Sequence, residues 1–171
     1  MPRILNIADL EFMKFGHGSA MPGKPAPEIF EAKLGDIGRR LGAQKLGYNL
    51  TIVPPGKRAF PIHNHRVNEE MFFIVEGEGE VRVGKERFPV KQGDVIACPP
   101  GGPETAHQIV NSGKRDIKYL SVSTLQSPEV VDYPESGKFG VRAEAIGPDG
   151  KPQVLRFLGR WGESLDYWDG E

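Results

Sequence analysis

Two histidines and two glutamates lie close together in the segment HNHRVNEE, which begins at residue 63. His63 and His65 are two positions apart, so on an extended chain both imidazoles lie on one face, with roughly 7 Å between their backbones. From that separation both rings can converge on one metal ion at about 2.1 Å. A carboxylate from Glu69 or Glu70 can occupy a third coordination position. The segment is equally compatible with a polar loop whose histidines face solvent, and its residues alone do not decide between these interpretations.

A third histidine favours the metal interpretation. His107, in GGPETAHQIVN, follows the run GDVIACPPG and begins another strand-like run. If the sheet closes on itself, that strand can bring the imidazole of His107 to the same interior point as His63 and His65. His17, in a Gly-rich N-terminal segment, is the remaining histidine, and we assign it no role.

Short apolar runs that end in turn residues must position these side chains. QKLGYNLTIV ends at a Pro-Pro-Gly turn, MFFIV ends at EGEG, and GDVIAC ends at PPGG. Strand-like runs separated by turn signals about every ten residues predict an all-β sandwich or barrel. We predict one domain with three parts: an irregular arm at 1–43 packing on the barrel, a barrel core at 44–125, and a C-terminal extension at 126–171. In the extension, VRAEAI and QVLRFL are expected to form a hairpin around GPDGK.

The run EMFFIVEG predicts a strand that is buried on both faces. Every second residue from Glu70 shares one face and every second residue from Met71 shares the other, and both faces are apolar beyond the glutamate. A sheet with one face in water would alternate with polar residues. We therefore expect the barrel core to cover one face, and the N-terminal arm or a second subunit to cover the other. The second possibility favours a homodimer.

The two histidine segments together resemble the two motifs of the cupin superfamily, and among its members the small bacterial single-domain cupins of unassigned function are the most similar in kind. The first motif is matched by Gly56, His63, His65, Glu70 and Gly77, and the second by Gly93, Pro99, Gly101, His107 and Asn111. The interval to Gly77 selects Glu70 over Glu69 as the matching acidic residue. The chain departs from the pattern in two places, since one extra residue precedes His63 and the loop GPETA before His107 is longer than usual.

The resemblance implies a double-stranded β-helix, the cupin or jelly-roll barrel. It also implies one divalent transition metal ion per chain, held by His63, His65, Glu70 and His107. Three neutral imidazoles and one carboxylate around such an ion leave a net charge of about +1 and, in octahedral geometry, open positions for a substrate. The donor set suits Mn, Fe, Ni, Co, Zn or Cu and does not choose among them.

Four further residues are candidates for the pocket. Glu104, in the lengthened GPETA loop, is the one extra acidic group that we predict as a general acid or base. Phe72 follows Glu70 at strand parity and Asn111 follows His107 in the same way, so both are predicted to line the substrate pocket. Tyr48 is added because Tyr48, Leu50 and Ile52 are expected to share the interior face of the first barrel strand. Alternatively, each of these residues has no functional role and lies simply in the barrel core or in an exposed loop.

The resemblance implies a metalloenzyme that acts on a small oxygen-rich molecule, such as a carboxylic acid, a sugar or sugar phosphate, or a diketone. A decarboxylase, a dioxygenase and an isomerase all fit this description. The alternative is a small-ligand-binding or sensing module without turnover. No nucleophile elbow, phosphate-binding glycine loop or dinucleotide fingerprint is present to suggest another enzyme class.

Composition excludes several other classes. The net charge of −1 gives no electrostatic footprint for nucleic acid, and we expect no nucleic-acid or membrane partner. The single cysteine rules out an intramolecular disulfide and suits a reducing compartment. The N-terminal run carries Asp9 and Glu11 where a secretory signal would be apolar. A cytoplasmic protein is the expectation.

Overall fold

The computed structural model describes residues 3–20 and 23–171, and the fold is built almost entirely of strands. The helical elements are the short helix α1 (Gly38–Leu41) and two 3-10 turns, η1 (Ile7–Asp9) and η2 (Pro103–Thr105). The strands are β1 (Met13–Gly16), β2 (Glu31–Asp36), β3 (Leu46–Val53), β4 (Asn64–His65), β5 (Glu70–Glu76), β6 (Glu78–Val83), β7 (Glu86–Lys91), β8 (Val95–Cys98), β9 (His107–Val110), β10 (Ile117–Thr124), β11 (Glu129–Tyr133), β12 (Lys138–Ile146) and β13 (Pro152–Arg160).

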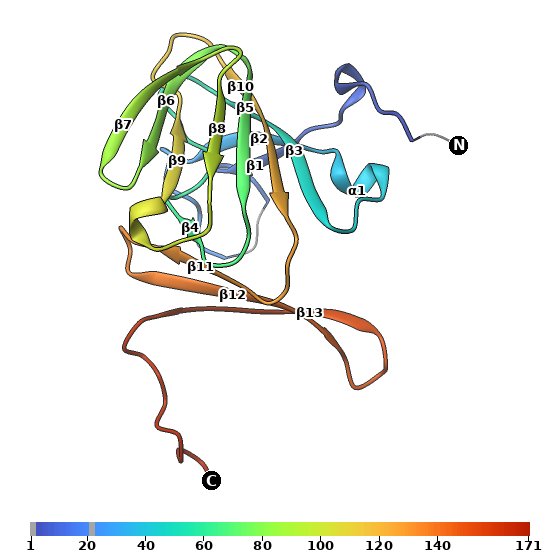
Figure 1. The fold of residues 1–171 in the computed structure, drawn as a ribbon, viewed down its shortest axis with the longest axis vertical. Helices are drawn as coiled ribbons and strands as arrows, with labels where there is room; N and C mark the ends of the chain where they lie inside the picture. The colour runs from blue at the N-terminus through green and yellow to red at the C-terminus, as the bar shows by residue number, and fades with distance from the viewer. Residues whose placement is uncertain (1–2, 21–22) are drawn as a thin grey trace.

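The strands form three sheets that close into a barrel (Figure 1). The sheets have the strand orders β1-β2-β3-β10-β5-β8, β13-β12-β11-β4 and β7-β6-β9. All pairings between these strands are antiparallel. The predicted all-β barrel is therefore confirmed. None of the helices in the described ranges is long or apolar enough to cross a membrane.

The interior of the barrel follows the predicted parity of β5. Phe72 and Ile74 are buried in the main core together with Val53 and Tyr119 from the neighbouring strands. The chain turns from β5 into β6 at Gly77, whose φ of 86° lies in the left-handed region. A Cβ at that position would lie 2.6 Å from the carbonyl oxygen of Asp116. Only glycine fits here, because both the backbone conformation and the close approach exclude a side chain.

N-terminal residues cover part of the outer face of the same sheet, and Phe73 of β5 stays exposed on that face. Leu10, Ile37 and Leu50 form a second apolar cluster, and Val75 packs against it from β5. The N-terminal residues therefore contact the outer face of this strand. Residues 1–43 are not irregular throughout, because β1 and β2 continue the sheet from β3; β2 lies in the run IFEAKLGDIGRRLG, for which the sequence allows a helical turn or a strand broken by glycines. These strands are short and interrupted by Gly and Pro, which hid their pattern in the sequence.

Tyr48 lies on the outer face of β3, contrary to the expectation that it points inward. Thr51 and Val53 are the fully buried residues of this strand, whereas Leu50 belongs to the outer cluster and Tyr48 packs against it. Parity could not orient β3, since apolar residues occur on both of its faces and both faces are covered.

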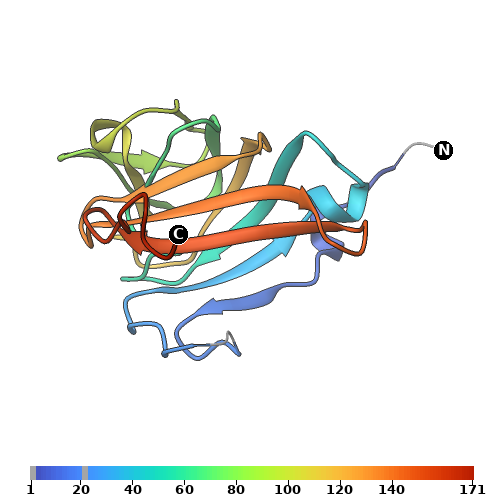
Figure 2. The ribbon, with the colours of Figure 1, turned by 90° about the horizontal axis from the view of Figure 1, so that it is seen from below.

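The C-terminal extension packs on the barrel at the end that carries β4. β11 pairs with β4 on one side and with β12 on the other. β12 and β13 form the predicted hairpin and lie across the end of the barrel (Figure 1). Viewed from that end, the three strands β11 to β13 lie side by side across the middle of the molecule (Figure 2). The blue strand β1 lies at the outer edge of its own sheet. The extension therefore adjoins the strand that carries His65.

Candidate metal centre

Three separate segments bring the four predicted metal ligands together. His65 ends β4, Glu70 begins β5, and His107 begins β9. His63 is joined to His107 by two backbone hydrogen bonds, in which the N–H of His107 donates to the His63 carbonyl at 2.8 Å and the N–H of His63 donates to the His107 carbonyl at 3.2 Å. This pairing links the two motifs across the barrel and fixes the spacing of their side chains.

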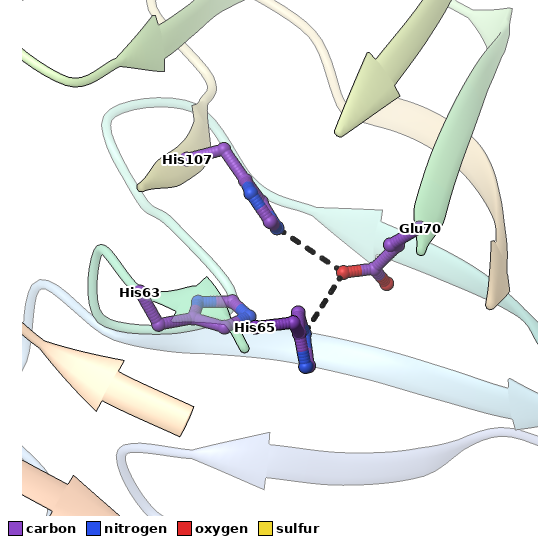
Figure 3. A group of neighbouring side chains, drawn as sticks. All are labelled: His63, His65, Glu70 and His107. Atoms are coloured by element: carbon purple, nitrogen blue, oxygen red, sulfur yellow. Dashed lines mark hydrogen bonds and ion pairs between the residues drawn. The ribbon is translucent and has the colours of Figure 1, made fainter. Parts of the chain in front are cut away.

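The donor atoms of His63, His65, Glu70 and His107 all lie within 4.8 Å of one another. Glu70 links two of the histidines: its Oε2 is 3.2 Å from Nε2 of His107 and 3.5 Å from Nε2 of His65 (Figure 3). The rings of His63 and His107 are 4.8 Å apart at their centroids. All four side chains converge on one point, as the spacing of the two motifs predicted.

The other ring nitrogens of the histidines face oxygen atoms. Nδ1 of His63 lies 2.8 Å from the Pro61 carbonyl oxygen, and Nδ1 of His107 lies 3.2 Å from that of Thr105. A carbonyl oxygen can only accept a hydrogen bond, so a proton on Nδ1 would satisfy these contacts and would leave the Nε2 lone pair for a metal ion once one is bound. Metal-binding histidines in proteins are held in this way by an acceptor behind the ring.

His107 and His65 each face acceptors at both ring nitrogens, which a neutral imidazole cannot satisfy. His107 has the Thr105 carbonyl on one side and the Glu70 carboxylate on the other. His65 faces Glu70 with Nε2 and the Glu129 carboxylate, 3.7 Å away, with Nδ1. A neutral ring has a single N–H and can donate to only one of its two acceptors. A cation between the imidazoles and Glu70 would interact favourably with the ring nitrogen that is left without a proton and with the carboxylate. The residues therefore fit a divalent cation, since their nitrogens and oxygen are the donors that transition metals bind.

The pKa values reflect the same electrostatics. Burial, reinforced by His107, lowers the pKa of His63 to about 4. For Glu70, burial acts to raise the pKa, but hydrogen bonds from His107 and His65 outweigh it and bring the pKa to about 2. Burial also opposes the charged form of His65, yet its contacts with Glu70 raise its pKa. At neutral pH the cluster thus offers a carboxylate and an uncharged His63 as ligands.

A cavity of about 470 Å³ reaches the cluster from the side of His65. Besides His65 it is lined by Glu129 of β11, by hydroxyl groups of β10, and by Arg142 and Arg156 of the C-terminal hairpin. Arg142 and Arg156 are direct partners in the register of β12 and β13. The guanidinium of Arg142 is already paired with the carboxylate of Glu144 at 3.1 Å, whereas Arg156 has no ion pair among the described residues.

The other predicted pocket residues lie in different surroundings. The ring of Phe72 packs edge-on against His107 at 5.6 Å, so it borders the cluster. Asn111 is fully buried away from the cluster and donates to the carbonyl oxygens of Val53 and Arg115. Tyr48 lines the rim of the cavity beside His65, although it does not point into the barrel. Tyr48 lies near the cavity because the first residues of β3 line it, and not because the side chain faces the interior of the barrel.

Glu104 is exposed in η2, and its carboxylate accepts a hydrogen bond from the N–H of Gly102 in its own loop. It lines a separate cavity with Arg82 and Ile62, and the lining of that cavity includes none of the four clustered residues. Its predicted role as an acid or base stays a prediction.

Glu129 is a residue of this site that sequence reasoning missed. It lies 59 positions beyond Glu70 in the chain, and no motif marks it. The one available signal is an acidic residue directly before the short run VVDY, which is too common to suggest a role.

Comparison with known proteins identifies the fold that holds the cluster. The sequence pattern of the family described as Cupin domain matches residues 49–123. Residues 49–123 form a cupin domain. The cupin domain begins in β3, ends in β10 and contains all four clustered residues, whereas Glu129 and the hairpin lie outside it.

Relatives of the cupin domain are found in distant organisms. An uncharacterized protein of Methanocaldococcus jannaschii is 40% identical over 72 residues, which cover 42% of this chain and 54% of that protein. An oxalate-binding protein of Thermotoga maritima is 33% identical over 73 residues, covering 43% of this chain and 57% of that protein. The matches thus span little more than half the length of either relative.

A solved structure resembles nearly the whole chain. The sugar phosphate isomerase of a cupin superfamily from Silicibacter pomeroyi has a TM-score of 0.76 and covers 97% of this chain and 98% of its own. Its sequence identity of 23% supports the fold alone. The likeness extends beyond the cupin domain to the N-terminal strands and the C-terminal hairpin.

Proposed function

We propose that the cupin domain binds one divalent transition metal ion through His63, His65, Glu70 and His107, and that it is a metalloenzyme acting on a small oxygen-rich substrate. The observation that carries the proposal is the convergence of four donor atoms within 4.8 Å of one another, three of them histidine nitrogens and the fourth an oxygen of a partly buried carboxylate. Burying a carboxylate without a cation is costly, and no lysine or arginine faces Glu70 among its charge partners in the described residues.

When bound, the ion would act as a Lewis acid for substrate oxygens. The protein's own residues orient the metal ligands and exclude water from the site. The carbonyl groups of Pro61 and Thr105 hold His63 and His107 in the tautomer that presents Nε2. Phe72 excludes water on the buried side of His107, because its ring packs directly against the imidazole.

The cavity beside His65 supports the substrate class. Its lining contains three arginines, Arg39, Arg142 and Arg156, and two acidic residues, Asp36 and Glu129. Such a lining favours a carboxylic acid or a sugar phosphate over an uncharged molecule. The names of the relatives are consistent with this class, since one is an oxalate-binding protein and a structural neighbour is a sugar phosphate isomerase.

A second candidate function is a small-ligand-binding cupin without turnover. It is favoured by the relative from Thermotoga maritima, whose name describes binding and no reaction. Both functions use the same metal ion and the same cavity, so they differ only in whether a bound anion is converted.

The test begins with metal content, measured by mass spectrometry on untagged protein purified without chelator. About one metal per chain, lost in His65→Ala, is the expected result, and its absence even after reconstitution with Mn, Fe, Ni, Co, Zn or Cu would overturn the proposal. The metal-loaded protein is then incubated with oxalate and with aldose and ketose phosphates, and binding and product formation are measured separately. Binding without product would favour the second candidate.

A further inference from the structure

The carboxylate of Glu129 holds the loop that connects two of the proposed metal ligands. Glu129 is the first residue of β11 and is only 5% exposed. Its oxygens accept hydrogen bonds from the backbone N–H groups of Arg66 and Val67 at 3.2 Å and of Asn68 at 2.8 Å, and from the side-chain amide of Asn68. These three residues lie between His65 and Glu70. A buried acceptor from the C-terminal extension therefore fixes the backbone between the two ligands.

The same carboxylate faces the back of the His65 ring. Nδ1 of His65 is buried and has no hydrogen-bond partner, and it lies 3.7 Å from Oε2 of Glu129. On the opposite side of the ring, Nε2 is 3.5 Å from Glu70. The other two histidines of the cluster have carbonyl oxygens behind their rings, at Pro61 and Thr105. His65 has a carboxylate in the equivalent place.

We propose that Glu129 is a positioning residue, which accepts the Nδ1–H of His65 and so directs the Nε2 lone pair to the metal ion. This inference rests on the proposed metal-binding function. A carboxylate behind a histidine also makes the ring a stronger donor than a carbonyl does, because its negative charge favours the partial positive charge that the ring acquires on binding a cation. Glu129 lies outside residues 49–123, so the affinity of the cupin domain for metal depends on the C-terminal extension.

Asp132 provides a matched control on the same strand. It is 4% exposed, and its Oδ2 accepts hydrogen bonds from the side chains of Asn64 and Arg66. It is therefore a buried, hydrogen-bonded carboxylate like Glu129, but it contacts none of the four proposed ligands. Replacing either carboxylate by its amide removes one buried charge from β11, and only one of the two replacements reaches His65.

The experiment compares Co²⁺ binding by the wild type, Glu129→Gln and Asp132→Asn in the full chain. The dissociation constant and the visible absorption spectrum of bound Co²⁺ are measured below the unfolding temperature of each protein, determined by circular dichroism. We expect Glu129→Gln to bind Co²⁺ about 10–100-fold more weakly, the range for loss of an outer partner of a metal ligand. We also expect it to shift the absorption bands. Asp132→Asn should lower thermal stability without changing the spectrum, and its affinity should stay close to that of the wild type.

Each alternative outcome identifies which idea has failed. If the wild type binds no metal, the proposed function is wrong. If the wild type binds and Glu129→Gln binds equally well with the same spectrum, Glu129 is not a positioning residue. Equal weakening in both variants would show that the effect is one of general stability, and would also overturn the inference. Should Glu129→Gln fail to fold, Glu129→Asp keeps the charge but draws it back by one methylene, and an unchanged affinity and spectrum in that variant would likewise rule out the positioning role.

Discussion

Nε2 of His107 lies 3.2 Å from Oε2 of Glu70, although 37 positions separate the two residues in the chain. The contact joins the start of β9 to the start of β5 across the interior of the barrel. A partly buried carboxylate so close to an imidazole whose other nitrogen already faces a carbonyl oxygen favours positive charge between them. This pair supports the metal-binding proposal. Variants of the clustered residues and of their neighbours test it.

His63→Ala and His107→Ala should each abolish stoichiometric metal binding. Each removes one of the four converging donors, and the remaining three would bind an ion far more weakly. Metal content by mass spectrometry, on protein purified without chelator, measures the loss. His17→Ala is the control, because His17 lies in the N-terminal segment and its Nδ1 contacts the carbonyl oxygen of Ala26. Full occupancy in either cluster variant would show that the site is assigned wrongly.

Acid should destabilise the metal-free protein through His63. Burial lowers the pKa of His63 from 6.5 to about 4. Between these values the unfolded chain binds a proton that the folded protein does not bind. The free energy of unfolding should therefore fall as the pH decreases from 6.5 to 4, with a contribution of up to about 1.4 kcal/mol per pH unit. Urea unfolding of chelator-treated protein at several pH values measures this slope.

His63→Gln is the matched control for the acid experiment, since its side chain does not titrate. The raised pKa of His65 acts in the opposite direction, because protonation of His65 favours the folded protein as the pH falls. His65 is present in both proteins, so the difference between them reports on His63. The variant should lose less stability than the wild type over the same pH interval, and parallel curves would contradict the prediction.

Asn111→Ala should destabilise the fold and leave the metal site intact. The side-chain amide of Asn111 is buried and donates to two backbone carbonyl groups, those of Val53 and Arg115, at 2.7 and 2.8 Å. Alanine leaves both acceptors unpaired, at a cost of about 2–4 kcal/mol in the free energy of unfolding. Thermal unfolding measures this cost. Normal stability with altered substrate binding would instead restore the pocket role expected from the sequence.

Glu104→Gln should leave metal content unchanged, because Glu104 is exposed and lines a cavity separate from the cluster. Its carboxylate accepts a hydrogen bond from its own loop. If Glu104 is the general acid or base that the sequence predicts, the variant should lower the turnover of an identified substrate, and unchanged turnover would rule that role out. Rate measurements on metal-loaded protein at several pH values test the point. A fall in kcat with full metal occupancy would establish Glu104 as an acid or base after all.

We expect a homodimer in solution, with a second copy covering β13. N-terminal residues cover Val75 on the outer face of β5 but leave Phe73 exposed, so this face gives only weak support for a second subunit. The C-terminal hairpin gives stronger support, since Phe157 and Leu158 are each 60% exposed on a strand at the edge of its sheet. Sedimentation at micromolar concentration should show a dimer, and Leu158→Glu should dissociate it. Val95→Glu, which alters an exposed residue of β8, is the control, and a monomeric wild type would refute the expectation.

Three features were predictable from local sequence. The repeated apolar runs and turn residues gave the barrel, and the inward parity of β5 placed Phe72 and Ile74 in the core. The hairpin of β12 and β13 was also visible, because its two runs flank a short Gly- and Asp-containing turn. Tyr48 was placed on the wrong face, since a strand that is apolar on both sides has no parity signal to orient it.

The sequence alone determined which residue types could bind a metal, because the spacing of His63, His65 and Glu70 is local and His107 follows an equally recognisable turn. Only the tertiary structure decided which neighbours support them. Glu129 reaches His65 because β11 pairs with β4, and that pairing depends on contacts between segments more than 60 positions apart. Such contacts leave no periodic trace in the sequence, since they arise from the closure of the barrel and not from any local pattern.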